Sequence, residues 1–174
     1  MAVQLRVVNA DDWLLWRPVR RAALTDAPDA FGSRLSEWND APESSWRERL
    51  SIPGALELLA IDVERDVPVG MATGLPAPGA SGRAGVISLW VDPAARGRGV
   101  ASALLDAIAR WAADGGAEAL ALSVMPGNDA ARRVYERNGF ALSDELGSPL
   151  PDGGHEIVMI RELRADPVGR PRQS

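Results

Sequence analysis

The chain contains no cysteine and no lysine, and it has a single histidine and a single tyrosine among its 174 residues. The lack of cysteine excludes disulfides, thiolate metal sites and a cysteine nucleophile. One histidine excludes a metal centre built from several imidazoles, so we expect no metal site. All 19 basic residues are arginine, which leaves the chain without a side-chain primary amine.

Composition and charge narrow the classes of protein further. With 46% hydrophobic residues, the chain can bury a sizeable core, and we expect one domain over residues 1–164. The net charge of −5 disfavours nucleic acid and anionic membranes as partners. No apolar run approaches membrane-spanning length and the N-terminus lacks a signal pattern, which favours a cytoplasmic protein. Residues 165–174, rich in proline and arginine, are expected to be disordered.

Hydrophobic periodicity predicts strands that alternate with helices, and hence a mixed α/β sheet. A first helix is expected to be capped by Asp11 or Asp12, with Pro18 awkward in its interior. Residues 26–37, 76–85 and 143–154 are predicted to be connections. The predicted strands cover residues 3–8, 56–63, 67–75, 86–91, 119–125, 140–142 and 155–163, and the helices residues 12–24, 42–50, 100–114 and 128–138.

The stretch from Val86 to Leu105 combines a strand, a short basic loop and a helix. Gly97 and Gly99 allow a sharp turn and a close approach of the backbone to a ligand. The helix that follows directs its unpaired N–H groups at the loop, and Arg96 and Arg98 add donors suited to phosphate oxygens. The loop indicates a pyrophosphate site, although an ordinary turn with solvated arginines is the simpler interpretation of the loop alone.

Two segments together match a longer pattern. Residues 96–101, R-G-R-G-V-A, fit R/Q-x-x-G-x-G/A, and residues 128–140 fit N-x-x-A-x-x-x-Y-x-x-x-G-F. In this order and spacing they resemble the two signatures of the GNAT acetyltransferase superfamily. The resemblance implies the acyl-CoA N-acyltransferase fold, with a mixed and mostly antiparallel sheet of about seven strands and about four flanking helices. Strands 4 and 5 are expected to splay apart and admit acetyl-CoA.

The resemblance also implies roles for individual residues. Backbone at Leu89 and Val91 would pair with the pantetheine amides, whereas Trp90 between them is expected in the core. Tyr135 takes the position of the general acid that protonates the CoA thiolate, although a core tyrosine with a satisfied hydroxyl is the alternative. The residues expected to bind the cofactor are Leu89, Val91, Arg96, Gly97, Arg98, Gly99, Val100, Ala101, Ser102, Asn128 and Ala131.

Two of the implied roles stay open, that of Asn128 and that of the general base. Asn128 could instead serve only as the N-cap of the helix that follows, because asparagine is one of the residues preferred at that position. The predicted fourth strand carries no carboxylate to serve as general base. Glu37, Glu43 or a water chain remain candidates for that role, and His155 is left outside the catalytic set.

The favoured hypothesis is an acetyl-CoA-dependent N-acetyltransferase acting on a primary amine of a small molecule or protein. Without cysteine, direct attack in a ternary complex is expected rather than a covalent acyl-enzyme. The alternative is a non-catalytic acyl-CoA-binding regulatory member of the same fold. A dinucleotide site fails because the loop lacks G-x-G-x-x-G. The resemblance also suggests a homodimer, by analogy only.

Overall fold

The computed structural model describes residues 1–31 and 33–163. The segment 165–174, for which we expect disorder, lies outside these described residues. Within them, no helix is both long and apolar enough to cross a membrane. The same part of the chain holds no cluster of acidic and histidine side chains suited to a metal ion.

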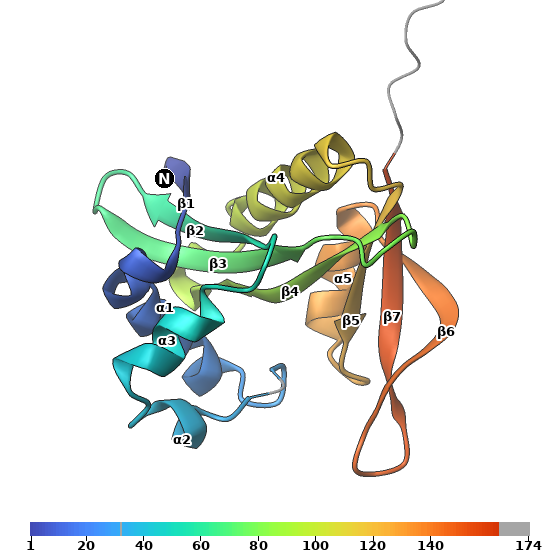
Figure 1. Ribbon diagram of the computed structural model, residues 1–174, viewed down its shortest axis with the longest axis horizontal. Helices are drawn as coiled ribbons and strands as arrows, with labels where there is room; N and C mark the ends of the chain where they lie inside the picture. The colour runs from blue at the N-terminus through green and yellow to red at the C-terminus, as the bar shows by residue number, and fades with distance from the viewer. Residues whose placement is uncertain (32, 164–174) are drawn as a thin grey trace, which may run out of the picture.

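A single seven-stranded sheet in the order β1-β2-β3-β4-β5-β7-β6 forms the centre of the described chain (Figure 1). Only β4 and β5 run parallel, and every other neighbouring pair is antiparallel. The mixed, mostly antiparallel sheet is therefore confirmed. The strands are β1 (Val3–Val7), β2 (Leu56–Asp62), β3 (Val67–Leu75), β4 (Arg83–Val91), β5 (Ala119–Val124), β6 (Ala141–Pro149) and β7 (His155–Glu162).

Helices cover both faces of the sheet (Figure 1). On one face, α4 (Val100–Asp114) packs against the central strands, and α5 (Asp129–Arg137) lies near β5. On the other face lie α1 (Trp13–Asp26), α2 (Leu35–Trp38) and α3 (Glu43–Arg49). The sheet therefore separates two cores, one under α4 and one under α1 and α3.

The core under α1 and α3 explains the abundance of tryptophan in the first third of the chain. Trp16 and Trp46 are fully buried there and meet edge to face, with ring centroids 6.1 Å apart. Trp13 and Trp38 pack against the same cluster. These large rings fill the space between the helices and the sheet, so their role is packing.

Strands β4 and β5 separate soon after they begin. Their pairing covers only the three residues Arg83 to Gly85 of β4, opposite Ala119 to Ala121 of β5. On its other side β4 carries a bulge against β3, because the register shifts between Met71 and Thr73. Ser88 lies in this bulge with φ of +56°, a left-handed conformation that residues other than glycine adopt at a cost. The divergence of the two strands opens the sheet in its middle.

The structure differs from the sequence expectations at three elements. The segment 143–149 is strand rather than loop, because β6 pairs with β7 despite its polar composition. Strand β4 begins at Arg83, inside the expected loop, and the short helix α2 interrupts another expected connection. These segments carry little local signal, and pairing with neighbouring elements determines their structure.

Asp12 is the N-cap residue of α1, as expected, but its side chain makes no capping hydrogen bond to this helix. The side-chain hydrogen bond lies one turn earlier, where Asn9 accepts from the backbone N–H of Asp11 in the 3-10 turn that leads into α1. Pro18 lies within α1, and the helix continues through it. Its ring is on the exposed side, so only one backbone hydrogen bond is lost.

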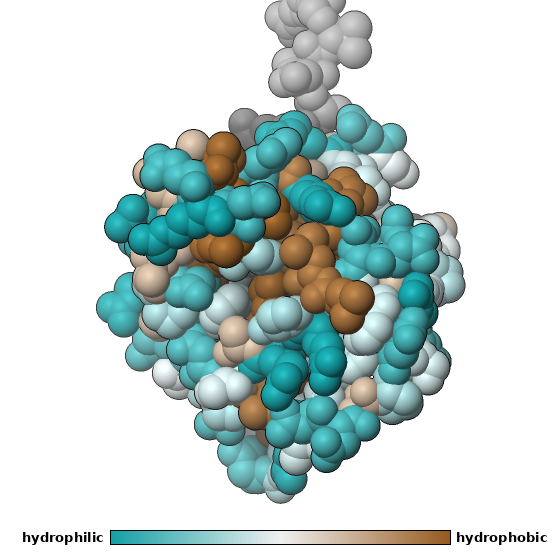
Figure 2. Space-filling model, turned by 90° about the vertical axis from the view of Figure 1, so that its left-hand side faces the viewer, coloured by the Kyte–Doolittle hydropathy of each residue, from teal (hydrophilic) through white to brown (hydrophobic). Residues whose placement is uncertain are grey.

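On the face shown in Figure 2, polar side chains surround an area of hydrophobic side chains near the middle. Exposed valines of the described chain are Val7 on β1, Val63 in the β2–β3 turn and Val67 at the start of β3. Exposed apolar residues are a normal part of a protein surface.

Candidate active site

A cleft of about 1380 Å³ follows the opening between β4 and β5. Both strands line it, together with the N-terminal end of α4, the inner side of α5 and the connection from α1 to α2. Pockets for one small molecule are commonly ~300–1,000 Å³, so this cleft has room for two reactants.

The N-terminus of α4 forms one end of the cleft. Gly97 and Gly99 have φ values of +73° and +80°, which explains the need for glycine at both positions. A Cβ at either position would meet no atom within 4 Å, so the backbone there faces open space. Gly99 is the N-cap and supplies no side-chain cap, which leaves the first N–H groups of this 15-residue helix available to an anion.

Of the residues expected at the cofactor site, all but one line the cleft. Arg98 is exposed and does not line it. The lining residues are Leu89, Val91, Arg96, Gly97, Gly99, Val100, Ala101, Ser102, Asn128, Ala131 and Tyr135. The structure thus brings two distant segments of the sequence to one cavity.

Arg96 is held against the cleft wall rather than free in solvent. Its Nε donates to the carbonyl oxygen of Val91 at 3.0 Å, and its Nη2 forms an ion pair with Asp26. Trp90, buried under α1 as expected, donates its indole N–H to the same Asp26 carboxylate at 3.0 Å. The Trp90 hydrogen bond and the Arg96 guanidinium lower the pKa of Asp26. Asp26 therefore stays ionised and orients Arg96.

Asn128 takes the structural role that its sequence context suggested. Its side-chain oxygen accepts from the backbone N–H of Ala131 at 3.2 Å and so caps α5. It also lines the cleft, so the cap and a ligand contact are compatible at this position.

Tyr135 lies on α5, with its ring edge to face against Phe140 at a centroid distance of 6.0 Å. Burial raises the pKa of its phenol to about 12. The hydroxyl is therefore protonated throughout the neutral and mildly basic range and can act as a proton donor inside the cleft.

Neither side chain expected as a candidate base lines the cleft. Glu37 accepts from the backbone N–H of Arg34, and Glu43 pairs with Arg47 on the surface. His155, which was left outside the catalytic set, lies opposite Pro149 at the β6–β7 end. The acidic residues that line the cleft within the described chain are Asp26, Glu145 and Glu156.

Glu156 differs from the other two cleft carboxylates. Asp26 and Glu145 pair with Arg96 and Arg83, whereas Glu156 has no ion pair among the described residues. Sequence reasoning missed it. The available signal was strand alternation in β7, which directs Ile157 and Met159 into the core under α4 and therefore Glu156 to the opposite face.

A largely buried polar cluster lies on the α1 side of the cleft, and no local pattern in the sequence predicts it. Arg49 pairs with Glu57 at 2.7 Å and donates to the Thr73 hydroxyl at 3.1 Å. Thr73 in turn donates to Glu57 at 2.6 Å. Arg20 and Arg49 both donate to the Ser88 hydroxyl in the β4 bulge, at 3.3 and 3.1 Å. Long-range packing alone brings these residues together.

Comparison with known proteins agrees with this fold and site. The acetyltransferase (GNAT) family model matches residues 16–140. A relative described as L-2,4-diaminobutyric acid acetyltransferase from Streptomyces coelicolor is 31% identical over 165 residues, which cover 88% of this chain and 87% of the relative.

Solved structures show the same fold. A GCN5-related N-acetyltransferase from Kribbella flavida has a TM-score of 0.72 at 25% identity, with 93% of this chain and 98% of that one covered. A PaiA N-acetyltransferase from Thermoplasma acidophilum in complex with coenzyme A has a TM-score of 0.70 at 16% identity, with 93% and 99% covered.

The chain belongs to the GNAT acetyltransferase family. It is an acyltransferase of a family that uses acetyl-CoA as the acyl donor. The residues present fit this donor, because the two glycines and the uncapped helix terminus leave space and N–H donors where a pyrophosphate is expected.

Proposed function

We propose that the protein transfers the acetyl group of acetyl-CoA to a primary amine, which attacks directly in a ternary complex. The observation that carries this proposal is that Tyr135 lines the cleft of a chain that belongs to an acetyltransferase family. Burial raises the pKa of its phenol to about 12, which favours the proton-donating form. The absence of cysteine supports direct attack. Acetyl-CoA supplies an activated thioester, and the chain's own groups hold the reactants and move the protons.

Two proton transfers are required of the protein. The amine nitrogen forms a bond to the acetyl carbon and loses a proton, while the carbon–sulfur bond breaks. We propose that Tyr135 donates its proton to the departing sulfur. The α4 N-terminus, with Gly97 to Ser102, would hold the pyrophosphate, and Arg96 would contribute its positive charge at the same end. Exposed Arg98 would act only at longer range.

We propose Glu156 as the group that accepts the amine proton, directly or through water, because it is the cleft carboxylate without an arginine partner in the described chain. Glu156→Gln is expected to lower kcat/KM for the amine by about 100-fold, with the affinity for acetyl-CoA unchanged. Steady-state kinetics at pH 7.5 measures the effect. Glu145→Gln, which alters a cleft carboxylate paired with Arg83, is the matched control and should change the rate less than about 3-fold. An unchanged rate in Glu156→Gln removes it from the mechanism.

Gly99→Ala tests the proposed pyrophosphate site. The added methyl group enters the open space at the α4 N-terminus, and the left-handed backbone is strained by ~1 kcal/mol. We expect the calorimetric Kd for acetyl-CoA to rise at least about 10-fold. Gly116→Ala is the matched control, because Gly116 has φ of +87° and equally open surroundings at the other end of α4. Equal affinity in the two variants would contradict the assignment.

The acceptor amine is tested by release of free CoA thiol. The relative named for L-2,4-diaminobutyric acid makes this compound a natural probe, beside other diamino acids, diamines and a peptide with lysine. Acetyl-CoA binding with amine-dependent thiol release supports the proposal. Binding without release from any amine would favour the non-catalytic alternative.

Two further features stay proposals. We propose a homodimer that uses the outer edge strand β6, where Leu142 and Leu146 are 50% and 78% exposed. Sedimentation equilibrium decides this point. A cytoplasmic location also remains a prediction from the sequence.

A further inference from the structure

A buried and a partly buried guanidinium group, those of Arg20 and Arg49, lie on the wall of the cleft that faces α1 and α3. Arg20 is only 4% exposed, yet it lines the cleft together with Arg49 and Ser88. Both guanidinium groups converge on the Ser88 hydroxyl in the β4 bulge. This bulge lies three residues beyond Gly85, the last residue of β4 that pairs with β5.

The charges of this cluster do not balance. Glu57 is its one carboxylate and pairs with Arg49, so that within the described chain Arg20 has no acidic partner. The Nε of Arg20 is buried without a hydrogen-bond partner there. Burial first, and then the charge of Arg49, lower the pKa of Arg20 to about 10, so it remains charged at neutral pH. Buried charges are ordinarily paired, and one unpaired positive charge beside a cleft indicates an anionic ligand.

Aromatic rings hold the Arg20 side chain in place. Its guanidinium carbon lies 5.9 Å from the Trp16 ring centroid and 5.1 Å from that of Phe31, which also lines the cleft. Stacking of this kind occupies the faces of a guanidinium and leaves its N–H edge for hydrogen bonds. An edge held in this way suits two-point binding of a carboxylate.

The site is separate from the proposed pyrophosphate site. The α4 N-terminus belongs to the opposite layer of the molecule, whereas Arg20 and Arg49 come from α1 and α3. A monoanion also matches the single excess charge better than a phosphate group, whose charge is about −1.5 to −2.

We propose that Arg20 and Arg49 bind a carboxylate of the acceptor, so that the acceptor is an amino acid or related amino carboxylate. This inference rests on the proposed acetyl transfer to an amine. Arg20 supplies the unpaired charge, and Arg49 and Ser88 hold it in position. The amine of the same molecule is then directed toward the opening between β4 and β5.

Paired acceptors test the proposal without a mutation. L-ornithine is compared with its carboxamide and with putrescine, and L-2,4-diaminobutyrate and L-lysine with their corresponding carboxamides and decarboxylated diamines. For the amino acid that reacts fastest, we expect kcat/KM to exceed that of both neutral analogues by at least about 30-fold. Equal values for acid and analogues overturn the proposal.

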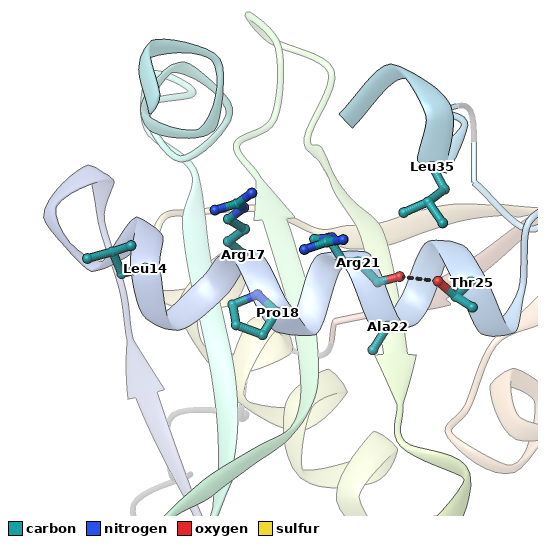
Figure 3. A pocket seen from close by; sticks show the side chains of 7 residues that line it. All are labelled: Leu14, Arg17, Pro18, Arg21, Ala22, Thr25 and Leu35. Atoms are coloured by element: carbon teal, nitrogen blue, oxygen red, sulfur yellow. Dashed lines mark hydrogen bonds between the residues drawn. The ribbon is translucent and has the colours of Figure 1, made fainter. Parts of the chain in front are cut away.

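Arg20→Gln should remove this preference by lowering kcat/KM for the acid alone, to within about 3-fold of the carboxamide. Arg17→Gln is the matched control. Arg17 lies on the same helix, has its guanidinium carbon 5.5 Å from the centroid of the Trp46 ring, and also has a buried Nε without a partner among the described residues. It lines a separate pocket and not the cleft (Figure 3). It should leave the preference intact. Equal losses for acid and carboxamide in Arg20→Gln would indicate a structural role and overturn the proposal.

Failure of catalysis and failure of this inference can be told apart. If no amine is acetylated although acetyl-CoA binds, the proposed function fails. Calorimetric titration with Nδ-acetyl-L-ornithine and with N-acetylputrescine then decides the carboxylate site by itself. Binding of the acid alone, lost in Arg20→Gln and kept in Arg17→Gln, supports it. Equal binding of both compounds, or binding of neither, overturns it.

Discussion

Replacing Tyr135 with phenylalanine is expected to lower kcat for acetyl transfer by about 100- to 1,000-fold. The change removes one oxygen from a ring that packs edge to face on Phe140, so the packing of α5 is retained. What is lost is the proton donor in the cleft. Stopped-flow or steady-state measurement of thiol release gives the rate, and calorimetry should show an unchanged Kd for acetyl-CoA.

The pH profile gives an independent check on Tyr135. Because burial raises its phenol pKa to about 12, the donor form is fully present at pH 7 and is lost only as the pH approaches that value. The wild-type rate should therefore keep rising as the acceptor amine loses its proton, with no decline below about pH 10. A decline centred near pH 8 that is absent in Tyr135→Phe would contradict a raised pKa. A full rate in the variant would remove Tyr135 from the mechanism.

Replacing Glu57 with glutamine is expected to destabilise the fold by about 3–5 kcal/mol. Glu57 is 3% exposed, pairs with Arg49, and is the one carboxylate of the described cluster, which also contains the guanidinium of Arg20. Glutamine preserves the shape but leaves two neighbouring positive charges uncompensated. Thermal unfolding should show a midpoint lower by on the order of 10 °C.

Glu43→Gln is the matched control for burial. Glu43 pairs with Arg47 at the same 2.7 Å distance as Glu57 with Arg49, but its side chain is 54% exposed. Solvent screens such a pair, so its loss should leave the midpoint of thermal unfolding nearly unchanged. Equal stability of the two variants would mean that the buried cluster contributes no more than a surface pair.

Elements with strong local patterns could be predicted from the sequence. The β2–β3 hairpin and helices α3, α4 and α5 lie within one or two residues of their expected positions. Gly97 and Gly99 adopt the positive φ values that their role in the loop requires. Such features depend on periodicity, capping and backbone sterics, which neighbouring residues determine.

Strand β6 could not be predicted from its own sequence. Its residues are mostly exposed on both faces and include Asp144, Glu145, Gly147 and Pro149, none of which favours a strand. Pairing with β7 supplies the backbone hydrogen bonds that the segment's own composition would not predict. An edge strand of this kind is formed by its neighbour and can be recognised only once the sheet is assembled.

By itself, the sequence determined the family, the glycine-containing loop before α4 and the placement of Tyr135 and Asn128 on one short helix, because each depends on residues close together in the chain. The tertiary structure alone decided which charged groups meet on the α1 side of the cleft, where we propose that the acceptor binds. Arg20 and Ser88 are 68 positions apart, and Glu57 and Thr73 come from two further strands. Glu156 reaches the same cleft from the last strand. No local sequence pattern predicts these contacts, because they form only when helices α1 and α3 pack on one face of the opened sheet.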